Sequence, residues 1–251
     1  MTVTTTDAAT VSPLDFQEAL DLQAVELERT VSMLRSLSPE QWSAATDCPG
    51  WDVHHMYLHV LGACEGGASM RENLHQMRAA RRLRKRNGGP LEAALSAVQV
   101  SERADITPQQ LVERLDGVAP ATIKGRRRTP SLMRRVSMGI DGPVVEKWTL
   151  GYLVGTIYLR DLWMHRVDAS RATGSELLLI TEHDGRIVTD VVAEWARRHG
   201  RPFDLELTGP AGGTFGSGDG GEAITMDAVD FCRLLAGRGE ASGLLSEIVP
   251  F

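Results

Sequence analysis

The chain has 251 residues, of which 42% are hydrophobic and 24% are charged, and its formal net charge is −6. This length and composition are ordinary for a folded protein with a buried core, and they exclude the disordered and fibrous classes. The negative charge argues against nucleic acid as the main partner, because affinity for a phosphate backbone depends largely on Lys and Arg.

Two local clusters, at residues 78–86 and 124–135, are rich in Arg and Lys although the net charge is negative. They are interpreted either as solvated helix faces and loops or as arginines that face an anionic ligand. No stretch reaches the roughly 18 apolar residues of a membrane span, and the first residues lack a basic segment followed by an apolar run. Three scattered cysteines do not indicate a disulfide framework. We therefore expect a cytoplasmic protein with no membrane partner.

The first part of the chain shows apolar residues at helical spacing. This pattern predicts a long helix over 13–37, a short helix restarting at Ser38, a second long helix over 51–70 and a third over 72–86. A capping signal at Thr107 predicts a helix that ends near Gly117. Residues 125–142 have a weaker pattern, and we expect a connection with some helix there.

Residues 143–169 give the longest helical segment, and no strand is predicted before them. After Gly174 the pattern changes to a short apolar run over 177–180, a helix over 184–199 and a half-buried strand over 203–207. The glycine-rich residues 209–221 are interpreted as turns, with 216–221 a hairpin connection before 222–226. A last helix is predicted over 227–236. The fold class is therefore α+β, with a helical domain over 1–172 and a small α+β domain over 173–251.

Asp161 and His165 lie four positions apart in the longest predicted helix, which places both side chains on one face. The pair is either two ligands of one metal ion or a simple ion pair within the helix. Asp168 is a candidate outer carboxylate that orients the imidazole of His165.

The predicted helix over 51–70 carries His54, His55 and His59, and either His55 or His59 can face the first pair. A histidine on a helix is commonly a surface or satisfied core residue, so none of them alone indicates a ligand. Two long amphipathic helices that both carry imidazoles favour a metal site, because helix bundles build such sites from facing side chains. Two imidazoles and one carboxylate leave coordination positions open, as a catalytic metal requires.

Other catalytic motifs receive little support. Cys48 precedes a proline just before the second long helix, where the helix dipole favours a reactive thiolate, but a buried structural cysteine is the alternative. The sequence has no GxSxG or Walker A motif and no GxGxxG in a βαβ setting. Serine hydrolase, P-loop and dinucleotide chemistry are therefore not indicated.

The segment 48–53 (CPGWDV) with the later His59, and the segment 160–168 (RDLWMHRVD), resemble the mycothiol-dependent maleylpyruvate isomerase family. Residues 231–238 (FCRLLAGR) are similar to the closing helix of that family, so the resemblance covers nearly the whole chain. It implies an α+β protein in which a DinB-like four-helix bundle is followed by a small α+β C-terminal domain.

The resemblance also implies a divalent metal, typically zinc, held by His59, Asp161 and His165, and it selects His59 over His55. Family members commonly carry glutamate where this chain has Asp161. The shorter side chain either draws the helix nearer the ion or weakens the binding of the ion. Arg238 matches an arginine that is implied to contact the substrate or the thiol.

The implied activity uses mycothiol as a low-molecular-weight thiol cosubstrate. Metal ligation deprotonates the thiol, and the thiolate adds to a small electrophilic substrate, for example a carboxylate, in an isomerisation or an S-transfer. Because a fold does not determine a function, two other hypotheses stay open. One is a non-enzymatic metal- or ligand-binding regulator on the same scaffold, and the other is a scaffold with an inactive site and an interaction role.

Overall fold

The structure, a computed structural model, describes residues 5–141 and 145–251. Their contacts form two compact units: the helical unit, residues 16–176, and the sheet unit, which joins the residues before 16 to residues 177–251. The sequence places the domain boundary between residues 172 and 173 and assigns the N-terminal residues to the first domain. In the structure these N-terminal residues belong with the C-terminal part, because strand β1 (Thr6–Asp7) pairs with a strand of the sheet there.

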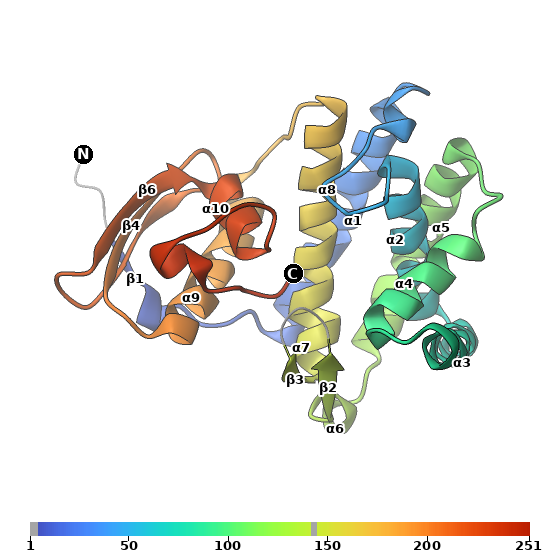
Figure 1. The fold of residues 1–251 in the computed structure, drawn as a ribbon, viewed down its shortest axis with the longest axis horizontal. Helices are drawn as coiled ribbons and strands as arrows, with labels where there is room; N and C mark the ends of the chain where they lie inside the picture. The colour runs from blue at the N-terminus through green and yellow to red at the C-terminus, as the bar shows by residue number, and fades with distance from the viewer. Residues whose placement is uncertain (1–4, 142–144) are drawn as a thin grey trace. The chain divides into compact units, whose positions relative to one another are not determined.

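The helical unit is built on four long helices that run alongside one another (Figure 1). They are α1 (Phe16–Ser36), α2 (Val53–Ala68), α5 (Pro108–Arg127) and α8 (Tyr158–Thr173). Their apolar faces form one core that includes Leu27, Tyr57, Leu61, Leu111 and Leu162. The predicted four-helix bundle is confirmed.

Further elements complete the helical unit. They are η2 (Gln41–Ser43), α3 (Met70–Asn87), α4 (Leu91–Ser101), α6 (Ser131–Arg134), β2 (Ser137–Asp141), β3 (Val145–Thr149), α7 (Leu150–Tyr152) and the π-helical turn η3 (Leu153–Ile157). Helix α4, which the sequence analysis does not predict, packs against α2 and α3.

Two helix predictions in this unit are wrong, and so is the expectation that no strand precedes residue 143, since β2 lies there. Helix α5 does not end near Gly117 but continues to Arg127, because its apolar face continues through Ile123 and an exposed glycine costs a helix only about 1 kcal/mol. The segment predicted as helix from Pro143 begins as strand β3, which pairs with β2 in an antiparallel hairpin. Residues Val145, Trp148 and Thr149 favour a strand, being β-branched or aromatic. Pro143 itself lies outside the described residues.

The sheet unit has a four-stranded sheet in the order β1-β5-β4-β6. Besides β1, its elements are η1 (Ala8–Thr10), η4 (Thr181–Gly185), α9 (Arg186–His199), β4 (Phe203–Thr208), β5 (Gly213–Ser217), β6 (Glu222–Asp227), α10 (Ala228–Leu235) and η5 (Gly243–Ser246). Trp195 on α9 packs against Phe203 and Phe231, with ring centroids 4.8 and 5.3 Å apart, and so joins helix and sheet in one core. The α+β class is confirmed.

The predicted hairpin connection at 216–221 is a crossover instead. Strand β4 lies between β5 and β6, antiparallel to the first and parallel to the second. The chain leaving β5 therefore passes over the start of β4, where a Cβ at Gly221 would lie 2.1 Å from the carbonyl carbon of Pro202. The glycines of this segment permit that close crossing of backbones.

Within the parts of the chain that the structure describes, no helix is both long enough and apolar enough to span a bilayer.

Candidate metal centre

His59 projects from the middle of α2. Asp52 caps the start of this helix, since its carboxylate accepts a hydrogen bond from the backbone N–H of His55 at 2.8 Å. The Nδ1 atom of His59 lies 2.8 Å from Oε1 of Gln99 on α4. An amide oxygen only accepts, so we assign the proton to Nδ1, which leaves the lone pair on Nε2.

A chain of glutamines sets the orientation of Gln99. The amide nitrogen of Gln76 on α3 donates to the carbonyl of Gly62 and to Glu72, each at 2.9 Å, and both of these groups are acceptors. Gln76 therefore presents its oxygen to the amide nitrogen of Gln99 at 3.0 Å. The oxygen of Gln99 is then the atom left for His59, and three helices together determine which nitrogen of His59 is free.

Helix α8 supplies Asp161 and His165. The π-helical turn η3 directly precedes it, and the amide of Gln23 on α1 donates to the carbonyls of Val154 and Gly155 in that turn, each at 2.7 Å. Farther along, the buried pair of Arg166 and Glu26 joins α8 to α1, with Nε and Oε1 2.5 Å apart. These contacts determine which face of α8 is turned toward α2.

The three predicted ligands meet between α2 and α8. His59, Asp161 and His165 each offer one ligand atom, and the three atoms lie within 4.8 Å of one another. Nε2 of His165 is 3.2 Å from Oδ1 of Asp161, and Nε2 of His59 is 3.9 Å from Oδ2. The side chain of His165 is 6% exposed, that of His59 15% and that of Asp161 32%, so the cluster is buried on one side and open on the other.

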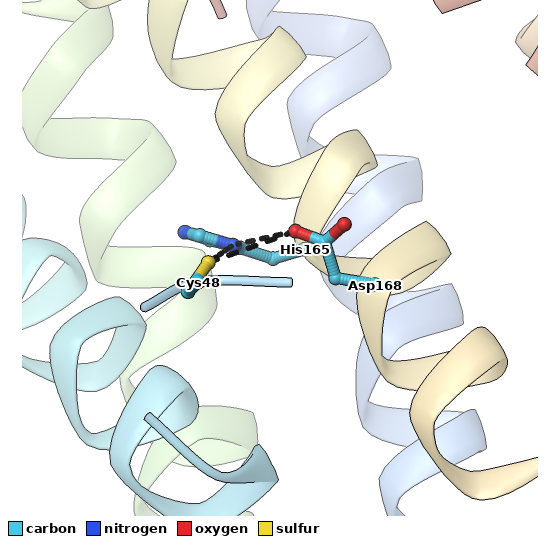
Figure 2. Close-up of side chains that lie close together, drawn as sticks. All are labelled: Cys48, His165 and Asp168. Carbon is cyan, nitrogen blue, oxygen red and sulfur yellow. Dashed lines mark hydrogen bonds and ion pairs between the residues drawn. The ribbon is translucent and has the colours of Figure 1, made fainter. Parts of the chain in front are cut away.

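Cys48 and Asp168 lie beside the other ring nitrogen of His165, Nδ1 (Figure 2). Nδ1 of His165 is 3.9 Å from Sγ of Cys48 and 3.8 Å from Oδ2 of Asp168, and the thiol lies 3.7 Å from the same carboxylate oxygen. These three residues also satisfy the distance criterion for a metal cluster. Figure 2 shows Cys48 coming from the loop before α2 and the other two residues from α8.

The charges of the cluster reinforce one another. Burial by itself lowers the pKa of His165, but the negative charge of Asp161 and the hydrogen bonds to Asp161, Asp168 and Cys48 together outweigh it and hold that pKa well above its ordinary value. Burial likewise raises the pKa of Asp161, but the charges of His165 and His59 and their hydrogen bonds together outweigh it, so that pKa lies well below its usual range. The ionised pair is thus the stable form of the site without an ion.

The remaining predicted residues lie elsewhere. His55 is exposed and its Nδ1 contacts Asp52 at 2.7 Å, whereas His54 packs edge-on against Trp42. Arg238 follows α10 in the sheet unit, where its backbone N–H donates to the carbonyl of Arg233 at 2.9 Å. Its role toward a substrate stays a prediction.

Sequence reasoning did not find Gln99. No sequence pattern points to this residue. It lies in a helix that was not predicted, and it is 40 residues from His59 in the chain.

Residues 24–170 match the family model of the mycothiol maleylpyruvate isomerase N-terminal domain, and this match spans more than half of the chain. The chain belongs to this family. Among solved structures, the fold is similar to the crystal structure of the mycothiol-dependent maleylpyruvate isomerase and to that of a histidine-to-alanine mutant of it. In each case the TM-score is 0.57 and the sequence identity 14%, over 91% of this chain and 93% of that chain. No curated protein sequence matches significantly.

Proposed function

We propose that this member of the family is a mycothiol-dependent metalloenzyme in which His59, Asp161 and His165 hold one divalent cation, which we take to be zinc. The observation that carries the proposal is the convergence of two imidazole nitrogens and a carboxylate oxygen from α2 and α8 within 4.8 Å. Family membership supports the choice of thiol, and the two similar crystal structures carry mycothiol dependence in their titles.

The donor set fits such an ion. Nε2 of His165 is buried and has no hydrogen-bond partner among the described residues, although Asp161 lies close to it. Nε2 of His59 has the free lone pair that Gln99 leaves it. Two nitrogens and one oxygen form the ligand set of catalytic zinc sites, with further positions left for a thiol or water.

Cys48 and Asp168 fit an outer role better than a ligand role. Both lie beside Nδ1 of His165, and metal-bound histidines usually pair their second nitrogen with such a polar group. In this arrangement they orient the imidazole so that Nε2 points to Asp161 and His59.

A bound divalent cation would lower the pKa of a ligated thiol and so supply a thiolate at neutral pH. The chain itself contributes the open side of the cluster, where Asp161 is partly exposed, and a buried wall formed by His165. A thiolate placed there forms a C–S bond to an electrophilic carbon. If that carbon belongs to a double bond conjugated to a carbonyl group of the substrate, the electron pair of the double bond moves to that carbonyl. Rotation about the resulting single bond follows, and loss of the thiolate restores the double bond. If the adduct takes up a proton and leaves, the reaction is an S-transfer. We assign Arg238 to substrate contact on the family resemblance alone.

The test begins with protein purified without added metal. Elemental analysis should find one divalent ion per chain in the wild type, and the His59→Ala and His165→Ala variants should lose it. His55→Ala is the matched control on the same helix and should retain the ion. Equal retention in all three variants would contradict the ligand assignment.

Metal-loaded protein is then incubated with mycothiol and a panel of electrophiles that includes maleylpyruvate, while thiol loss and cis-to-trans conversion are followed separately. Conversion without thiol loss supports an isomerase, and thiol consumption supports an S-transferase. A protein that holds its ion and turns over no electrophile would be the non-enzymatic binder instead.

A further inference from the structure

A cavity of about 480 Å³, partly open to solvent, lies in the helical unit next to the candidate metal centre. Gln99, the partner of His59, lines it. Ala63 and Tyr158 also line it, and they lie one helical turn from His59 on α2 and from Asp161 on α8. The volume is within the range of small-molecule sites, and Met77, Leu95 and Val154 give it apolar walls.

Arg126 is the charged group buried in the wall of this cavity. It is 5% exposed, and its Nε has no hydrogen-bond partner among the described residues. Its Nη1 donates to Oε1 of Gln23 at 2.6 Å, and its guanidinium lies 4.6 Å from the centre of the Tyr158 ring. A Cβ at Gly67 would lie 3.1 Å from Nε, so the glycine leaves that edge uncovered by a side chain.

Arg126 is held in place by neutral groups. The amide of Gln23 donates to the two carbonyls of η3, which directs its oxygen at Arg126. The face of Tyr158 adds a cation–π contact. These contacts fix the guanidinium without neutralising it.

Other buried arginines of the same unit differ in this respect. Arg103 forms ion pairs with Glu65 and Glu72, and Arg166 forms one with Glu26. No carboxylate within the described residues forms an ion pair with Arg126. A buried charge without a partner is costly, so proteins keep one where a ligand supplies the counter-charge.

We propose that this cavity binds a small organic anion, a carboxylate with an apolar body, and that Arg126 pairs with its carboxylate. The inference rests on the proposed function in one respect only, which is that the metal centre is where the ligand reacts. The ligand would extend past Tyr158 and Gln99 toward that centre. The proposal also bears on the two interpretations of the basic cluster 124–135. Arg126 lines the cavity and would face an anionic ligand, whereas Arg127 is exposed and pairs with Asp21.

The test measures binding without thiol, so that it does not depend on turnover. Full-length protein is titrated calorimetrically with trans-cinnamate and with trans-cinnamamide, which share shape and apolar body but differ in charge. The wild type should bind the carboxylate at least about tenfold more tightly than the amide, as a charge-assisted hydrogen bond to a buried guanidinium predicts. Equal affinity for the two probes, or no binding of either at millimolar concentration, overturns the proposal.

Three variants test whether the preference for cinnamate over cinnamamide comes from Arg126. Arg126→Gln should lose about tenfold to a hundredfold in affinity for cinnamate and change little for cinnamamide, whereas Arg126→Lys should recover part of the loss. Arg127→Gln, the exposed neighbour, is the matched control and should bind like the wild type. Cinnamate binding that is the same in Arg126→Gln and in the wild type overturns the proposal.

Metal content separates the two proposals. If Arg126→Gln keeps its ion and its cinnamate affinity, the cavity assignment fails while the metalloenzyme proposal stands. If His59→Ala loses its ion but still prefers cinnamate to cinnamamide, the anion site stands whatever the chemistry at the metal centre.

Discussion

Each imidazole of the candidate metal centre has a polar neighbour at one nitrogen and faces Asp161 with the other. His59 contacts Gln99 through Nδ1, and His165 has Cys48 and Asp168 beside its Nδ1. In both rings the Nε2 atom is the one near Asp161. This common arrangement favours a shared ion over a chance ion pair on α8, which would need only one of the two histidines.

Removing the partner of His59 should weaken the metal centre without removing a ligand. Replacing Gln99 with Leu leaves the ring free to turn and its tautomer unset, so we expect metal affinity to fall by about tenfold to a hundredfold. Titration with zinc against a competing chelator measures this. Gln109→Leu, on an exposed position of α5, is the control and should bind zinc like the wild type.

The three cysteines should differ in accessibility. Cys48 is partly exposed, whereas Cys64 and Cys232 are buried, and burial raises the pKa of the Cys64 thiol. Native protein treated briefly with N-ethylmaleimide should therefore take up one label per chain, at Cys48, as peptide mass spectrometry would show. Labelling of Cys64 at a comparable rate would mean that the bundle opens near the metal centre.

At the scale of elements, the crossing of α2 and α5 depends on glycine. A Cβ at Gly125 would lie 2.1 Å from the carbonyl oxygen of Gly67, so the two backbones touch where these helices meet. Helix α5 carries a second glycine, Gly117, which is exposed and has open space around it. The two positions share a helix but not a packing environment.

Alanine at these two positions should change stability in opposite directions. Gly117→Ala should stabilise the protein by about 0.5–1 kcal/mol, because alanine is the better helix former. Gly125→Ala should destabilise it by more than about 1 kcal/mol, since the methyl group forces α2 and α5 apart. Urea unfolding followed by circular dichroism gives both values, and a stabilised Gly125→Ala protein would contradict the close crossing.

The sequence predicts the long helices better than the short elements. The helices α1, α2, α3 and α9 follow from apolar periodicity, and the capping box predicted at Thr107 is present. The hairpin of β2 and β3 was missed because five-residue strands carry little periodic signal and pair only with each other. The order of the sheet was missed for a related reason, since no local pattern shows that β4 lies between β5 and β6.

At the scale of the whole molecule, residues near the start of the chain complete the sheet unit, which is otherwise formed by its C-terminal part. Strand β1 adds to the edge of β5, and the backbone N–H of Leu14 donates to Asp190 at 3.0 Å. The N-terminal residues are therefore part of the fold of a unit that otherwise begins at residue 177. A tag or truncation at the N-terminus is therefore expected to perturb the pairing of β1 with β5.

Deleting residues 1–11 should loosen that sheet selectively. With β1 gone, the edge of β5 loses its parallel neighbour, so amide hydrogens in peptides covering 213–217 should exchange faster. Peptides covering 53–68 in the helical unit serve as the internal control and should exchange as before. Hydrogen exchange with mass spectrometry measures both, and unchanged protection of β5 would show that the first strand contributes nothing.

The sequence by itself determined the bundle helices, the α+β class and the spacing that puts Asp161 and His165 on one face, because helical periodicity and caps are local properties of the chain. The family resemblance selected His59, but only the tertiary structure placed it beside that pair with Gln99 behind it, and only the tertiary structure put Arg126 in the wall of a cavity where no carboxylate of the described residues pairs with it. Those features depend on how segments far apart in the chain pack together, and side-chain packing across helices leaves no period or motif in the sequence of any one of them.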